Sequence, residues 1–541
     1  MNKKLLVTLT VFTSLMFTSC SSNSKESSQP TKDSITLMQN GELQSLDVSE
    51  HADLITWNML ENTMEGLYKS GKNHQPEPAI ATKVVQPTDN ATVYTFPLRK
   101  DALWSNGDPV TAQDFVAAWR RSVSPTAKSG YNYIFSGIEN ADAITTGQKK
   151  VEELGVKALD SHTLQVKLEH PMPYFNKMMV MPAFFPESQA ALKKFGSKYG
   201  TSSDNLYYNG AFKLTGWSGS NESWTLKQNP HYYDQKSIKL KSIKYLVVKD
   251  STTAHELFEQ NKLDEATVTG VTAKELQKDP KLVRQNRAGN YYLRVNLADG
   301  HPLSNKKMRQ ALSLVIDRKS LTKNVLADGS VPAYTYVAKD LTDDPTTEKD
   351  FASAHTPKKT YDVKAAQKLW EEGRKEAGLN QKVKLTAVGD DQTVTKNILE
   401  FIQSSVQKNL TDVEVTMRNI PAKSASEEVH SGKFDLSKTL WLADFADPIS
   451  FMTILTKDNP QNYGKYNDSY YDELYKKAST SDLNNQAKYW KLLNDLEERL
   501  NETMPVIPLY QMVESHLVNP NLKGVLRHPV GENDYTRAYL K

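Results

Sequence analysis

The segment W-L-A-D-F-A-D-P, from Trp441 to Pro448, places an aromatic ring and a carboxylate close together in the chain. The ring face of Trp441 would attract a cation, and the carboxylate of Asp444 would accept hydrogen bonds from an ammonium group. The segment is short and ends in proline, which predicts a loop rather than a helix. The pattern indicates a site for a cationic amine, although a loop with one core tryptophan and one turn-forming aspartate would explain the same residues.

Other residue patterns that carry chemistry are missing from the sequence. His255-Glu256 is not followed by the second histidine of a zinc-protease helix, and there is no G-x-S-x-G, S-x-x-K or P-loop motif. The paired aspartates at 343–344 and 390–391 lack the glycine and the terminal glutamate of a calcium loop. We therefore expect no catalytic residues, no metal and no cofactor, which favours a binding protein over an enzyme.

Length and composition set the broad class of the protein. A chain of 541 residues is too long for one hydrophobic core, so we expect more than one lobe. Apolar and charged fractions of 38% and 24% are typical of a globular protein. The net charge of +3 and the absence of a basic block argue against nucleic acid as a partner.

The first residues have the pattern of a secretory signal. Lys3 and Lys4 precede an apolar run, Leu5 to Phe17, that is too short to span a bilayer. Cys20 is the single cysteine and stands where a lipoprotein signal peptidase would cut, although Phe17 replaces the usual leucine. We expect a signal peptide at 1–19, a diacylglycerol on the Cys20 thiol with palmitate as a further acyl chain, a flexible tether at 20–33, and a location on the outer face of the cell membrane.

The rest of the chain predicts a mixture of strands and helices. Strand patterns lie at 35–37, 92–98, 162–168, 223–228 and 243–248, and amphipathic helix patterns lie at 111–121, 308–316, 363–377, 395–409 and 486–500. Such alternation favours α/β lobes over a helix bundle or a β-sandwich. Trp104 and Trp119 flank or lie in a helix pattern, and we expect both in the core.

A series of phrases along the chain resembles the oligopeptide-binding lipoproteins of bacterial ABC importers, the family 5 extracellular solute-binding proteins of Gram-positive type. They include M-E-G-L-Y (64–68), Y-T-F-P-L-R-K-D-A-L-W-S-N-G-D-P-V-T-A-Q-D-F (94–115), N-G-A-F-K-L (209–214), R-Q-A-L-S-L-V-I-D-R (309–318), the Trp441–Pro448 segment and M-P-V-I-P-L-Y (504–510). The phrases keep the family order from about residue 35 to the end.

The resemblance implies an α/β, two-lobed, periplasmic-binding-protein-like (Venus flytrap) fold with an extra inserted subdomain. Lobe one would comprise residues 34–64, 205–285 and 508–541, the inserted subdomain residues 65–204, and lobe two residues 286–507. The ligand would lie between the lobes, which would close on it. A monomer that captures an oligopeptide and delivers it to a membrane permease is the implied function.

The resemblance also implies peptide-binding residues. Asp444 would take the α-amino group, with Trp441 beside it, and Lys438 stands where a relative has an arginine near the peptide C-terminus. Main-chain contacts are implied for Asn209, Gly210 and Ala211 and, as a second contact, for the Ala52–Leu54 segment, while Tyr131 would line the cleft. A purely structural role is the alternative for each of these residues.

Four alternatives stay open. A pheromone receptor of the same fold would differ in the tightness of its pockets, and other members of the class bind dipeptides, nickel, haem or sugars. A surface adhesin or signalling protein would have kept the fold and lost transport. An extracellular peptidase would need the catalytic residues that the sequence lacks.

Overall fold

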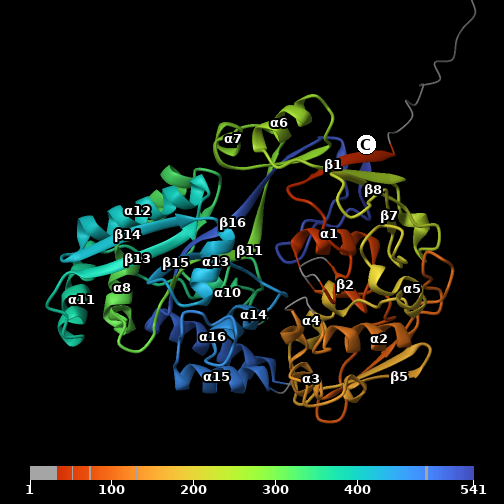
Figure 1. The fold of residues 1–541 in the computed structure, drawn as a ribbon, viewed down its shortest axis with the longest axis horizontal. Helices are drawn as coiled ribbons and strands as arrows, with labels where there is room; N and C mark the ends of the chain where they lie inside the picture. The colour runs from red at the N-terminus through yellow and green to blue at the C-terminus, as the bar shows by residue number, and fades with distance from the viewer. Residues whose placement is uncertain (1–32, 51–52, 72–74, 128–130, 346, 482–484) are drawn as a thin grey trace, which may run out of the picture. The chain divides into compact units, whose positions relative to one another are not determined.

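The longest sheet gathers strands from both ends and from the middle of the chain. The computed structural model describes residues 33–541 except 51–52, 72–74, 128–130, 346 and 482–484 (Figure 1). In this part of the chain the sheet has eleven strands: β14 (Val413–Ile420), β13 (Val383–Asp390), β15 (Leu436–Leu442), β11 (Leu282–Val295), β16 (Val506–Val518), β10 (Glu265–Val268), β1 (Ser34–Gln39), β9 (Ser242–Val247), β8 (Ser223–Gln228) and β7 (Phe212–Thr215) in spatial order, with β12 (Val331–Pro332) against β16.

Two long strands connect the halves of this sheet. β11 and β16 pair antiparallel from Leu282 opposite Leu517 to Arg294 opposite Val506, with irregular register between Asn286 and Asn290. β15 pairs with the second half of β11, and β10 pairs with the far end of β16. The lobe boundaries expected near residues 285 and 507 lie within these two paired strands.

The predicted secondary structure is confirmed at most positions. The strand patterns become β1, β4 (Val93–Pro97), β6 (Thr163–Lys167), β8 and β9. The helix patterns become α2 (Ala112–Ser122), α8 (Lys306–Val315), α11 (Val363–Glu376), α12 (Thr393–Asn409) and α16 (Gln486–Thr503). The loop expected at 441–448 is wrong at its start, because Trp441 and Leu442 end β15, where Trp441 pairs with Asn290 of β11.

The segment 65–204 has a small sheet of its own. Its strand order is β4-β6-β5, with β5 at Val156–Asp160, and α2 lies against β5 and β6. Asp114 in the first turn of α2 accepts hydrogen bonds from the Thr111 backbone N–H at 2.9 Å and from the Trp104 indole at 3.2 Å, which begins the helix at its Thr cap. Trp104 and Trp119 are buried, so their predicted structural role is confirmed.

A second apolar core lies around α8, α11 and α12. These helices pack on one another and on β13 to β16 through Leu312, Trp370 and Ile402, among other buried side chains. None of the described helices is both long and apolar enough to cross a bilayer. In the described ranges, no cluster of His, Cys, Asp or Glu side chains is arranged to hold a metal ion.

Candidate functional site

A cavity of about 390 Å³ lies where helix α1 (Leu54–Thr63), the segment after β15 and the C-terminal segment meet. Most of its lining is apolar or aromatic, and four of its residues carry a carboxyl or guanidinium group. The apolar and aromatic residues are Leu54, Trp57, Tyr131, Val180, Met181, Pro182, Leu442, Ala443, Pro529 and Val530, and the ionisable acids and base are Asp53, Glu61, Asp444 and Arg287. Three carboxyl groups against one guanidinium suit a cationic ligand in an apolar chamber.

Asp444 is held in the cavity wall with one oxygen in use and one without a partner. Its backbone N–H donates to Ser450 Oγ at 2.8 Å, and its Oδ1 accepts a hydrogen bond from the Tyr131 hydroxyl. Oδ2 is buried and has no hydrogen-bond partner in the part of the chain that the structure describes. Burial raises the pKa of Asp444 to about 7, against the lowering effect of the Tyr131 hydrogen bond.

Tyr131 and Trp57 supply the aromatic surface near Asp444. Their rings are in edge-to-face contact, with centroids 5.1 Å apart and planes at 88°. Both residues line the cavity, and the Trp57 indole N–H is buried without a partner among the described residues. An aromatic wall, a free donor and a free carboxylate oxygen together suit a ligand with both amine and carbonyl groups.

Trp441 is held by a backbone contact and by the core. Its indole N–H donates to the Ser450 carbonyl at 3.1 Å, and its ring packs against the core. Trp441 is not among the residues that line the cavity. Ser450 thus fixes both residues of the predicted pair, Trp441 through its carbonyl and Asp444 through its hydroxyl, but only Asp444 reaches the cavity.

Lys438 lies on β15 away from the cavity and already has partners. Its ammonium group donates to Thr395 Oγ1 at 3.0 Å, lies 3.7 Å from Asp390 and stands 4.7 Å from the centre of the Tyr291 ring. Burial lowers its pKa, against the raising effect of Asp390. The structure therefore does not bring Lys438 together with Asp444 in one cavity.

The segment Asn209–Ala211 fastens the end of helix α1. The Asn209 side chain bonds to the backbone N–H and C=O of Glu65 at 3.0 and 2.9 Å, and the Gly210 N–H donates to the Thr63 carbonyl at 2.9 Å. A Cβ on Gly210 would lie 2.5 Å from the carbonyl carbon of Thr63. These residues do not line the cavity, and the close approach at Gly210 is to helix α1.

The remaining predicted residues divide into two groups. Leu54 lines the cavity and is 49% exposed. Ala52 and Cys20 lie outside the described residues, so the expected backbone contact at Ala52 and the expected lipid attachment stay predictions.

Sequence reasoning missed Trp57 and Glu61, although a signal for them was present. Leu54, Trp57 and Glu61 follow one another at intervals of three and four residues, so they share one face of α1. This face lines the cavity. Burial, together with the nearby charge of Glu532, raises the pKa of Glu61 to about 8.

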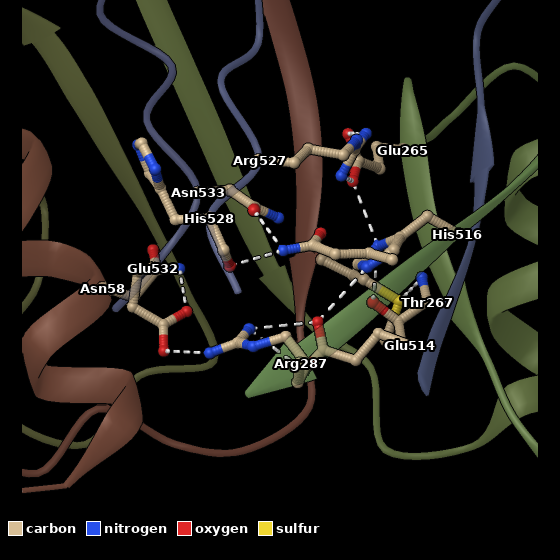
Figure 2. A network of polar contacts seen from close by, with 12 residues as sticks. Asn58, Glu265, Thr267, Arg287, Glu514, His516, Arg527, His528, Glu532 and Asn533 are labelled. Atoms are coloured by element: carbon tan, nitrogen blue, oxygen red, sulfur yellow. Dashed lines mark hydrogen bonds and ion pairs between the residues drawn. The ribbon is translucent and has the colours of Figure 1, made fainter. Parts of the chain in front are cut away.

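Arg287 connects the cavity to a buried network of charges on and around β11 and β16. Figure 2 shows its guanidinium between Glu514 and Glu532, and the nitrogen-to-oxygen distances are 3.2 and 3.6 Å. His516 lies 3.1 Å from Glu265 and 3.3 Å from Glu514. The network joins β10, β11, β16 and the C-terminal segment, so the cavity wall at Arg287 is held by the strands that run between the two halves of the sheet.

Comparison with known proteins finds relatives of this chain. Residues 75–463 match the sequence model of the bacterial extracellular solute-binding proteins, family 5 (middle region). The chain is 34% identical to the dipeptide-binding protein DppE of Bacillus subtilis (strain 168), over 89% of this chain and 87% of the relative.

Two solved structures are similar over almost the whole chain. One is Listeria monocytogenes OppA bound to peptide, at 34% identity and a TM-score of 0.79, covering 94% of this chain and 99% of the other. The second is the pheromone receptor PrgZ, at 35% identity and a TM-score of 0.81, covering 94% of this chain and 100% of the other.

Proposed function

Because this chain belongs to the family 5 bacterial extracellular solute-binding proteins, we propose that it is the peptide-binding receptor of an ABC importer. The predicted two-lobed α/β fold is confirmed by the similarity to solved members of the family. Proteins of this family bind solutes, which agrees with the binding cavity described above.

The buried Oδ2 atom of Asp444 carries the proposal. A carboxylate oxygen in an apolar wall without a partner is costly, and an ammonium group would relieve that cost. The α-amino group of a peptide would fit the position, and the indole N–H of Trp57, a residue of the same wall, would donate to a peptide carbonyl. DppE is a dipeptide-binding protein and the Listeria OppA structure has a bound peptide, which supports a peptide as the solute.

Calorimetric titration of the purified protein with short peptides tests this function. Free-amine peptides should bind, and their N-acetylated counterparts should bind at least tenfold more weakly, since a charge-assisted hydrogen bond contributes about 1.5 to 3 kcal/mol. Asp444→Asn keeps an acceptor for Tyr131 and should remove this difference. No binding of any peptide from a mixed library would contradict the proposal.

A pheromone receptor is the second candidate, favoured by the similarity to PrgZ. Native mass spectrometry of the protein purified from its own host separates the two possibilities. Many co-purified masses of varied length would support a general oligopeptide receptor. A single peptide mass would support a pheromone receptor.

Membrane attachment and delivery complete the proposed function. A diacylglycerol on Cys20, with residues 20–33 as the tether, would hold the protein beside its permease on the outer face of the membrane. Lipid labelling of the wild-type protein and of Cys20→Ser tests the anchor. Peptide uptake by cells that carry a deletion of the receptor, with and without the restored chain, tests delivery to the permease.

A further inference from the structure

A smaller cavity of about 50 Å³ adjoins the main cavity behind Glu61. Glu61, Ser70 and Val180 line both cavities, so they form the wall that the two share. A water molecule needs about 10 to 15 Å³ on the same scale, so the smaller cavity has room for a charged group and part of its alkyl stem. We refer to it as the side cavity.

The walls of the side cavity combine apolar surface with acids. Met64, Tyr68 and Phe185 supply the apolar surface. Glu61, Glu65 and Asp534 supply three carboxyl groups. Apolar walls that end in carboxylates are the environment that a lysine or arginine side chain prefers, because its stem is apolar and its end is charged.

Glu65 lines the side cavity with one oxygen in use and one without a hydrogen-bond partner among the described residues. Glu65 is only 8% exposed, and its Oε1 accepts a hydrogen bond from the Tyr232 hydroxyl at 2.5 Å. Its Oε2 is buried and has no hydrogen-bond partner in the described part of the chain. A buried carboxylate oxygen without a donor is costly, so an arriving donor would gain that energy.

The acids that line the side cavity outnumber its basic residues. Lys69 and His528 are the basic residues among those that line the side cavity, against three acids. Lys69 is half exposed to solvent, and burial raises the pKa of Glu65 more than the charges of Lys69 and Arg99 lower it. The side cavity therefore keeps an excess of acceptors.

We propose that Glu61 and the side cavity form a subsite for a basic side chain, so that the protein favours peptides whose amino-terminal residue is lysine or arginine. The inference rests on the proposed function, in which Asp444 holds the α-amino group. Asp444 and Glu61 line the same cavity, so one amino-terminal residue would present its α-amino group to the first and its side chain to the second. Because the pKa values of both acids are raised, binding of a residue with two positive charges would be accompanied by release of protons from Asp444 and Glu61 to the solvent.

Matched peptides test the subsite. Calorimetric titration compares Lys-Ala-Ala-Ala, norleucine-Ala-Ala-Ala and Ala-Lys-Ala-Ala, in which norleucine keeps the length of the lysine stem and lacks the charge. The wild-type protein should prefer the amino-terminal lysine over norleucine by about tenfold or more, as one charge-assisted contact requires. Glu61→Gln should reduce this ratio to threefold or less, and Glu65→Gln should reduce it in the same direction.

An exposed acid provides the control. Glu473 lies on the surface and pairs with Lys477 at 2.6 Å, so Glu473→Gln should keep the wild-type ratio. Equal affinities for the lysine and norleucine peptides would overturn the subsite and leave the proposed function standing. A preference for lysine at the second position alone, or a ratio unchanged by both cavity variants, would also overturn it. Failure of all three peptides to bind would overturn the proposed function itself.

Discussion

The ammonium group of Lys177 lies 2.8 Å from Oδ2 of Asp447. Lys177 is on the short helix α4 (Phe175–Met178) in the segment 65–204, and Asp447 follows Asp444 in the segment after β15. The Asp447 side chain is 1% exposed, and its Oδ1 accepts the Tyr489 hydroxyl at 2.6 Å. The pair therefore holds together the two parts of the chain that supply Tyr131 and Asp444.

Lys177→Met should weaken peptide binding by about tenfold, although Lys177 is not in the cavity wall. The change leaves a buried carboxylate without its cation and favours arrangements in which Tyr131 and Asp444 are apart. Titration with a free-amine peptide measures the effect. Lys477→Met, which breaks an exposed pair with Glu473, should leave the affinity unchanged. An unchanged affinity in Lys177→Met would show that this pair does not support the binding arrangement.

Peptide affinity should fall as the pH is lowered through 7. Burial raises the pKa of Asp444 to about 7, and an ammonium ligand needs the charged carboxylate. Between pH 7.5 and pH 5.5 the affinity for a peptide with neutral side chains should fall by about tenfold or more. Asp444→Asn should lose most of this slope. A wild-type affinity that is constant over this window would contradict the role of Asp444.

The unliganded protein should show the opposite trend in stability at this site. Folded Asp444 keeps a proton at pH 5 that the unfolded chain, with an ordinary aspartate pKa of 3.8, has released. Protonation therefore favours the folded state, and the contribution is lost as the pH rises through 7. Melting temperatures of the wild type and of Asp444→Asn are measured without peptide at pH 5 and pH 8. The wild-type value minus the Asp444→Asn value should be larger at pH 5 than at pH 8.

Glu265→Gln should destabilise the protein by about 3 kcal/mol at pH 7. Glu265 is 4% exposed and bonds to both terminal nitrogens of Arg527 at 2.8 and 2.9 Å, with His516 at 3.1 Å (Figure 2). Removal of the Glu265 charge leaves Arg527 and His516 with one negatively charged partner fewer. Urea unfolding measures the loss, and Glu42→Gln, at an exposed pair with Lys249, should cause no measurable change.

The same residue should affect acid stability. Burial alone would raise the pKa of Glu265, but His516 and Arg527 lower it to about 2. Its stabilising contribution is therefore present above the unfolded value of 4.5 and is lost as the pH falls toward 2. The decrease in stability between pH 5 and pH 2 should be smaller in Glu265→Gln than in the wild type, and equal slopes would contradict this assignment.

Gly210→Ala should destabilise the fold, because the new Cβ would lie 2.5 and 2.6 Å from backbone atoms of Thr63 and Met64. Thermal unfolding should show a loss of about 2 kcal/mol or more, a magnitude typical of overpacking at a rigid contact. Gly147→Ala is the comparison: at φ 75° with open space around it, it should cost only the backbone strain of about 1 to 2 kcal/mol. Wild-type stability in Gly210→Ala would show that the α1 end can move aside.

Local structure and part of the site could be predicted from the sequence. Helix α2 begins at its Thr111 cap and β8 alternates buried and exposed residues, because caps and periodicity act within a few residues. Asp444, Tyr131 and Leu54 were candidates from the sequence, and the structure places all three in the cavity wall. The resemblance to the family put these three residues forward.

Only the tertiary structure decided which side chains meet. Trp441 and Lys438 lie on β15, the strand that leads to Asp444. Because β15 pairs with β11, Trp441 contacts Ser450 and Lys438 contacts Asp390. The face of α1 that carries Trp57 and Glu61 became part of the site because the C-terminal segment and the segment after β15 pack beside it. Such contacts depend on strand order and on chain crossings hundreds of residues apart, which local propensity does not encode.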